Sequence, residues 1–151
     1  MIREMTLADA LHVIGRMRES DRRALAAVCP GMTDEAFAMD RYSTDYRWTV
    51  CAADGEPVVI GGARLTQSRT AMLWMVATPR LNAVIKTVMR FAGRFCRELF
   101  VHDVARRLEG SFIEGEAACE RWAARFGMEF EGCRRKAGAN GENIVIFGKV
   151  D

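Results

Sequence analysis

Residues 77–91, "ATPRLNAVIKTVMRF", join an apolar run of strand length to a long segment whose apolar residues have helical spacing. The start of a helix binds phosphate well, because its first backbone N–H groups are unpaired and the helix dipole is positive there. Arg80 adds a positive charge at this junction, and a run of free amides is expected after it. We therefore predict a site for a phosphate-bearing ligand, made by Arg80, Asn82, Ala83, Val84 and Ile85.

The same stretch has an alternative interpretation. Glycine is favoured wherever the backbone must come close to a phosphate, because it has no Cβ. Ala83 and Ile85 stand at the two places where the smallest residues are wanted, and the branched side chain of Ile85 would crowd the ligand. In the alternative these residues only begin a packed helix, and the residue types favour it.

Glu109 and Glu114 are the candidates for proton transfer. Both belong to residues 106–115, "RRLEGSFIEG", which we expect to form a strand bounded by glycines. A positioned carboxylate can take a proton from an ammonium group and so make the amine a nucleophile. The alternative is that both are ordinary solvated surface residues.

Other catalytic patterns are missing. Ser111 has no nucleophile-elbow glycines around it, and no Walker or dinucleotide-binding glycine pattern occurs. There are only two histidines and no CxxC pair, so we expect no metal. The five scattered cysteines are predicted to be reduced, mostly buried thiols: Cys29, Cys51, Cys96, Cys119 and Cys133.

A basic stripe runs along the segment after Asn82, at spacing of three and four residues. Together with residues 106–107 and "CRRK" (133–136) it could face DNA or an acidic partner. The net charge is only +2, and the aromatic residues that bind single strands are not interleaved with the stripe. We expect a solvated face and no nucleic acid. The stripe consists of Lys86, Arg90, Arg94 and Arg97.

The periodicity predicts one mixed α/β domain over residues 1–151. Strands are expected at 1–5, 47–54, 57–66, 70–78, 106–115, 128–136 and 143–150, and helices after Thr6 and Thr33 and over 82–100 and 116–127. Residues 18–28 either continue the first helix or restart at Ser20. Gly61-Gly62 predict a bulge or a close backbone approach, and Asn140-Gly141 a hairpin turn. A central sheet, mixed but mostly antiparallel, with helices on both faces follows from this order.

No apolar run approaches the roughly 20 residues that span a bilayer, so we expect no membrane contact. The first residues contain Glu4 and Asp9 and do not resemble a signal peptide. An intracellular protein is expected.

Three stretches carry a resemblance to a known family. The element order and "EGEAACERWAARFGMEFEG" (114–132) resemble the GNAT N-acetyltransferases, whose closing helix bears an aromatic residue, here Trp122, before a glycine, here Gly127. "HVIGRMRESDRRAL" (12–25) and "WTVCAADGEPVVIGGARL" (48–65) resemble GNAT-like bacteriophage proteins related to internal virion protein A of short-tailed phages.

The resemblance implies a GNAT-like fold and acetyl-CoA as the cofactor. The site at Arg80 to Ile85 would hold its pyrophosphate, and the strands over 70–78 and 106–115 would separate to admit the pantetheine arm. The family's usual acid is a tyrosine on the closing helix, and the matching Trp122 is a very poor acid.

Two function classes stay open. The first, which the residues favour, is a non-catalytic or weakly catalytic phage protein that acts in virion assembly or binds a host protein. The second is an acetyl-CoA-dependent N-acetyltransferase of a small amine or a protein amine. The resemblance places the protein in the host cytoplasm or the virion, with virion or host proteins as partners. The apolar strand over 143–150 would either pair across a homodimer edge or lie inside the sheet.

Overall fold

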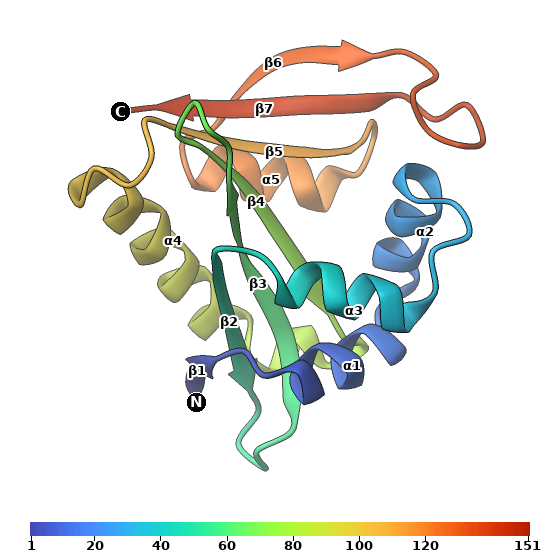
Figure 1. The fold of residues 1–151 in the computed structure, drawn as a ribbon, viewed down its shortest axis with the longest axis vertical. Helices are drawn as coiled ribbons and strands as arrows, with labels where there is room; N and C mark the ends of the chain where they lie inside the picture. The colour runs from blue at the N-terminus through green and yellow to red at the C-terminus, as the bar shows by residue number, and fades with distance from the viewer.

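Seven strands form one sheet in the order β1-β2-β3-β4-β5-β7-β6 in the computed structural model, which describes all 151 residues (Figure 1). Every neighbouring pair is antiparallel except β4 and β5, which are parallel. The predicted mixed, mostly antiparallel sheet is confirmed. The strands are β1 (Ile2–Glu4), β2 (Tyr46–Cys51), β3 (Pro57–Leu65), β4 (Thr70–Ala77), β5 (Arg107–Ile113), β6 (Glu129–Arg134) and β7 (Ile144–Val150).

Five α-helices and one 3-10 turn connect the strands. They are α1 (Leu7–Gly15), α2 (Glu19–Val28), α3 (Asp34–Tyr42), the 3-10 turn η1 (Pro79–Ala83), α4 (Ile85–Val101) and α5 (Ala117–Arg125). The chain after α1 restarts as a separate helix, α2, rather than continuing the first. No helix is both long enough and apolar enough to cross a lipid bilayer.

The helices divide between the two faces of the sheet, as predicted (Figure 1). Helices α1, α2 and α3 pack on one face through a core that includes Ile14, Leu25 and Phe37, with Ile60 and Val76 contributed by the sheet. Helices α4 and α5 cover the other face through two further clusters, which include Val58, Val88, Leu99, Leu108 and Ala123.

Local sequence signals explain several element boundaries. The hydroxyl of Thr6 accepts from the Asp9 amide, and the Asp9 carboxylate accepts from the Thr6 amide, so a capping box starts α1. A Cβ on Gly62 would lie 1.9 Å from the carbonyl oxygen of Tyr46, which confirms the close backbone approach predicted there.

Strand β7 lies between β5 and β6 and is paired on both sides. The apolar strand is therefore inside the sheet, and pairing across a dimer edge through it is wrong. The hairpin that joins β6 to β7 is present, with Gly141 at φ +83°, a left-handed conformation that glycine adopts without strain.

The pairing of β4 with β5 covers only three positions. Thr70 faces Arg107, Ala71 faces Leu108 and Met72 faces Glu109, and then the register ends. Strand β4 continues to Ala77, still paired with β3, and β5 continues to Ile113, still paired with β7, but the two strands no longer pair with each other. We call these unpaired continuations, residues 73–77 of β4 and 110–113 of β5, the divergence. It is the separation of strands that the resemblance implied.

Candidate functional site

The divergence leaves main-chain groups of β4 directed toward β5. Thr78 donates its N–H to the carbonyl of Val58 at 2.9 Å, which makes it a residue bonded to β3. In an antiparallel pair such residues alternate with residues whose main-chain groups point to the opposite edge. Ala77 and Met75 are of the second kind. Because β5 no longer pairs there, the N–H and C=O of Met75 have no partner, and an extended ligand can bond to them as an added strand would.

The main chain of Ala77 is already occupied by α2. Its N–H donates to the carboxylate Oδ2 of Asp21 at 3.0 Å, and its carbonyl accepts the N–H of Arg18 at 2.9 Å. The guanidinium of Arg18 donates two bonds, at 3.0 and 2.9 Å, to the same carboxylate. We call this arrangement of Arg18, Asp21 and Ala77 the clasp. It places the first turn of α2 at the end of β4, at one end of the divergence.

The turn after β4 consumes most of the amides that were predicted to hold an anion. Thr78 starts a 3-10 turn: its hydroxyl accepts from the Arg80 amide at 3.4 Å and its carbonyl from the Leu81 amide at 3.1 Å. The i to i+3 bonding of a 3-10 turn uses the amides of Asn82 and Ala83 in the same way. The Val84 amide donates to the Leu81 carbonyl at 3.0 Å.

The free amides lie at the start of α4, later than predicted. The first N–H to find a carbonyl within this helix is that of Val88, which donates to Val84 at 3.0 Å. Val84 provides no side-chain cap, and the amides of Ile85, Lys86 and Thr87, the first of α4, have no carbonyl partner within this helix. Of the predicted set, only Ile85 keeps a free amide. Its side chain packs against the core cluster that contains Val84, and the crowding expected from it stays a prediction.

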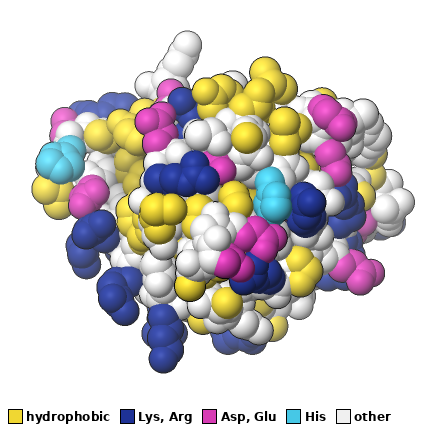
Figure 2. Space-filling model, turned by 90° about the horizontal axis from the view of Figure 1, so that it is seen from below, with side chains coloured by type: hydrophobic (Ala, Val, Ile, Leu, Met, Phe, Trp, Pro, Cys, Tyr) yellow, Lys and Arg dark blue, Asp and Glu magenta, His cyan; other side chains and the backbone are white.

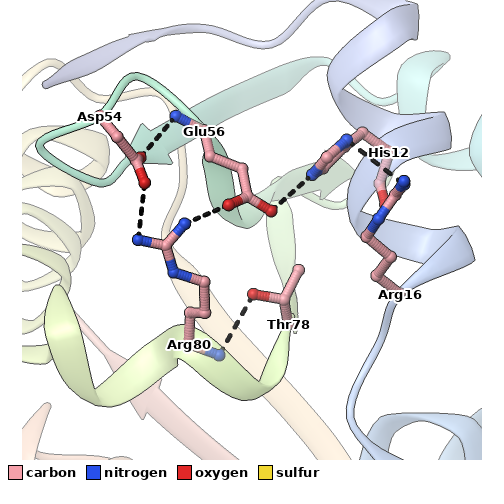
Figure 3. Close-up of polar contacts among 6 residues, drawn as sticks. All are labelled: His12, Arg16, Asp54, Glu56, Thr78 and Arg80. Atoms are coloured by element: carbon pink, nitrogen blue, oxygen red, sulfur yellow. Dashed lines mark hydrogen bonds and ion pairs between the residues drawn. The ribbon is translucent and has the colours of Figure 1, made fainter.

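Arg80 is held by the turn between β2 and β3 (Figure 3). Its guanidinium pairs with Asp54, at 2.9 Å, and with Glu56, and Glu56 also bonds to His12 at 3.2 Å. The bond from His12, with that from Arg80, lowers the pKa of Glu56 below its ordinary value, and Asp54 and Glu56 raise the pKa of Arg80. An anion at Arg80 must therefore compete with two carboxylates. The role predicted for Arg80 stays a prediction.

The two candidate bases lie apart along the chain, Glu109 inside β5 and Glu114 just after its end. Glu109 stands at the last paired position, beside the divergence, with its side chain 16% exposed and bonded to Arg107 at 2.9 Å. Arg107 also pairs with Glu131. Glu114 follows the end of β5 and accepts from the side-chain amide of Asn143 at 2.8 Å. Five residues of strand separate the two backbones by about 16 Å, so they do not serve one atom together.

Helix α5 places Trp122, partly buried, against the core and Cys119 near the clasp. The indole of Trp122 packs against the core and lies edge-on to Phe126, with ring centroids 6.0 Å apart. Cys119, one turn earlier, is half-buried; burial raises the pKa of its thiol, and the nearby carboxylates of Glu116 and Asp21 raise it further.

All five cysteines are free, but only Cys51 and Cys96 are buried, so the expectation of mostly buried thiols is wrong. No group of three or more His, Cys, Asp or Glu side chains is arranged to hold a metal ion. The four basic side chains of the stripe along α4 are all exposed. Figure 2, which looks at the end of the molecule that carries the β2–β3 turn, shows Lys and Arg side chains projecting into solvent along one edge.

Two open hollows lie elsewhere. One, of about 530 Å³, lies at the connection between α2 and α3 and includes Cys29 and Met32. The other, of about 330 Å³, lies between the edge of the sheet and α4 and is walled by Tyr46, Phe91 and Phe95. Neither opens onto the divergence, which the clasp closes at its end.

Comparison with solved structures identifies the fold. The chain matches ribosomal-protein-alanine N-acetyltransferase from Brucella melitensis at 15% identity, over 100% of this chain and 99% of that one, with a TM-score of 0.76. It matches a mutant of spermidine N-acetyltransferase from Vibrio cholerae at 10% identity, over 99% and 94%, with a TM-score of 0.74. It also matches a ribosomal alpha-N-protein acetyltransferase solved with coenzyme A, at 11% identity, over 99% and 92%, with a TM-score of 0.76.

Sequence comparison adds nothing to this, because no family model and no curated protein matches the chain. Nothing in these comparisons bears on a phage origin, so that part of the resemblance stays a prediction. The structural matches cover 99 to 100% of this chain at low identity, with TM-scores of 0.74 to 0.76. The chain therefore has the GNAT fold, the fold of these N-acetyltransferases.

Proposed function

We propose that this protein is an acetyl-CoA-dependent N-acetyltransferase that acts on a small amine or a protein amine. The observation that carries the proposal is that unpaired main-chain groups lie on both sides of the strand-to-helix junction, in β4 before it and at the start of α4 after it. Met75 offers an N–H and a C=O in the divergence, and three free amides follow at the start of α4. The solved structures of the same fold act on ribosomal-protein alanine and on spermidine, and one was solved with coenzyme A joined by a disulfide to a cysteine of that protein.

The residues fit two parts of acetyl-CoA. The main chain of Met75 matches the extended, amide-bearing pantetheine arm, because it presents one donor and one acceptor along a strand edge. The amides of Ile85, Lys86 and Thr87 match a pyrophosphate, because they are unpaired at the positive end of a helix dipole. Lys86 and Arg90 add exposed positive charge on the same helix.

Acetyl-CoA supplies an activated acetyl thioester when it is bound. The N–H of Met75 is directed into the divergence, where it can hydrogen-bond to a carbonyl oxygen as charge builds up on it. Glu109 stands at the last position where β4 and β5 pair, and it is our candidate to take the proton from the acceptor ammonium. Arg107 holds the Glu109 side chain in place.

A second function keeps one observation in its favour. The clasp and the pairs around Arg80 satisfy, with the protein's own side chains, groups that a coenzyme would otherwise use. A non-catalytic GNAT-fold protein that binds a virion or host protein would have no need to leave those groups free. No specific feature of the surface points to such a partner.

The test is acetyl transfer from acetyl-CoA to a panel of amines. The reaction is monitored by the free thiol of the coenzyme A that it releases. The panel contains spermidine, a lysine-free peptide with N-terminal alanine, and the N-acetylated form of the same peptide. We expect turnover on at least one of the first two and none on the blocked peptide. Absence of turnover on the whole panel, combined with no binding of acetyl-CoA at millimolar concentration, would favour the non-catalytic protein.

A further inference from the structure

The clasp presents to β4 the same pair of groups that an extended amide ligand would present. The Arg18 N–H is bonded to the carbonyl of Ala77, and the Asp21 carboxylate is bonded to its N–H. Ala77 is two residues from Met75, so its main chain lies on the same edge of β4. A ligand that follows this edge from Met75 to the start of α4 must pass Ala77.

We infer that the first turn of α2 is a built-in plug of the coenzyme path, which acetyl-CoA has to displace before it binds along β4. This inference rests on the proposed function, because it concerns the path of the same coenzyme. Plug and ligand use the same N–H and the same carbonyl, so the two states exclude each other. The closed state then lowers the apparent affinity in proportion to its population.

The plug is built to come away while the rest of α2 stays in place. Beyond its first turn α2 is anchored by the buried Leu25, by the ion pair of Arg23 with Glu116 on α5, and by the Ala27 carbonyl, which accepts the Ala139 amide at 2.8 Å. The first turn has no side-chain cap, because Arg18 is the N-cap residue and its side chain bonds to Asp21 instead.

Release therefore requires only a few local contacts to break. They are the two main-chain bonds of Ala77, and the Arg18–Asp21 pair can remain intact as the turn moves. The plug is tested through Asp21. Its side chain is 16% exposed, accepts the amide of Ala77, which is 56 positions away in the sequence, and is held by two bonds from Arg18.

The experiment compares the wild type with Asp21→Ala and with Glu19→Ala. Glu19 is the matched control: it is an exposed acid in the same first turn, and its side chain makes no hydrogen bond. Two quantities are measured: the dissociation constant for acetyl-CoA by calorimetry, and the hydrogen-exchange rate of the Ala77 amide in the free protein by NMR. Asp21→Asn, which keeps the volume and removes the ion pair, is the second variant in case Asp21→Ala does not fold.

We expect Asp21→Ala to bind acetyl-CoA about tenfold more tightly than the wild type, the scale of one lost hydrogen bond to a charged group. Exchange of the Ala77 amide should accelerate at least as much, and Glu19→Ala should match the wild type in both. Asp21→Asn should lie between the wild type and Asp21→Ala.

Three results would overturn the plug. Equal affinity in Asp21→Ala and the wild type, with fast exchange at Ala77, would mean that the ligand does not pass this residue, while the proposed function stands. Weaker binding in Asp21→Ala would make Asp21 part of the binding surface, again with the proposed function intact. Absence of binding in the wild type and in both Asp21 variants would overturn the plug and the proposed function together.

Discussion

The main chain at the junction between β4 and α4 divides into a satisfied half, whose groups are bonded inside the protein, and a free half, whose groups are not. From Ala77 to Val84 the amides are satisfied inside the protein, by Asp21, by Val58 and by the 3-10 turn. On either side of this half, at Met75 and at residues 85–87, they are free. The difference teaches that the bonding of each amide, and not the charge or identity of its residue, decides which groups remain available to an anion. Arg80, the most suggestive side chain, belongs to the satisfied half.

The largest effect is expected from Glu109, which lies beside the divergence. A positioned base contributes about 10² to 10⁴ in rate, so Glu109→Gln should lower kcat for acetyl transfer by about a hundredfold at neutral pH while acetyl-CoA binding stays unchanged. Glu114→Gln is the matched control, because Glu114 lies just after the end of β5, and it should retain kcat within about twofold. An equal loss of kcat in both variants would mean that the proton transfer does not take place beside the divergence.

A tenfold effect is expected from the free half of the junction. Lys86→Pro removes one free amide, and proline is tolerated in the first turn of a helix. Lys86→Ala removes the same charge but keeps the amide. The proline variant should bind acetyl-CoA about tenfold more weakly than the alanine variant, the scale of one charge-assisted hydrogen bond. Circular dichroism shows whether both retain the helix; equal affinities in two folded variants would contradict an anion site at α4.

A smaller effect is expected from the satisfied half. Arg80 is neutralised by Asp54 and Glu56, so Arg80→Ala should change the dissociation constant for acetyl-CoA by less than about threefold, the size of an exposed pair. Calorimetric titration of the variant measures this. A loss of tenfold or more would show that the guanidinium leaves its carboxylates to bind the coenzyme, and the original interpretation of the junction would be restored.

The smallest effect concerns stability and pH at the same cluster. The pKa of Glu56 is lowered in the folded protein by His12 and Arg80, so its contribution to stability is present above the ordinary glutamate pKa and is lost as the pH falls through the lowered value. Glu56→Gln should therefore lower the thermal midpoint slightly at pH 7 and by less at pH 3. An equal drop at both pH values would mean that packing, and not charge, links the β2–β3 turn to Arg80.

Signals that act over a few residues were readable from the sequence. The Thr6 and Asp9 capping box, the paired glycines of β3 and the alternation of strands and helices each depend on neighbours in the chain, and they gave the sheet and both helical layers. The start of α4 was predicted three residues early, because Thr78 caps a 3-10 turn that competes with the helix.

Contacts between distant residues were not readable. Asp21 and Ala77 are 56 positions apart, and Arg80 and Glu56 are 24 apart. No spacing rule predicts that a carboxylate in α2 takes the amide at the end of β4, or that the turn between β2 and β3 neutralises Arg80. For that reason the location of the candidate site could be predicted, while the residues that are free to bind could not.

The most direct test of the account is amide hydrogen exchange across the junction, measured by NMR with and without saturating acetyl-CoA. Binding along β4 and at the start of α4 predicts strong protection of the amide of Met75, where β4 no longer pairs with β5, and of the first amides of α4, those of Ile85, Lys86 and Thr87. The amides of Leu81 and Val84, already bonded, should change little. Protection that leaves Met75 and the α4 amides unchanged would contradict the account, as would the absence of any change at millimolar ligand.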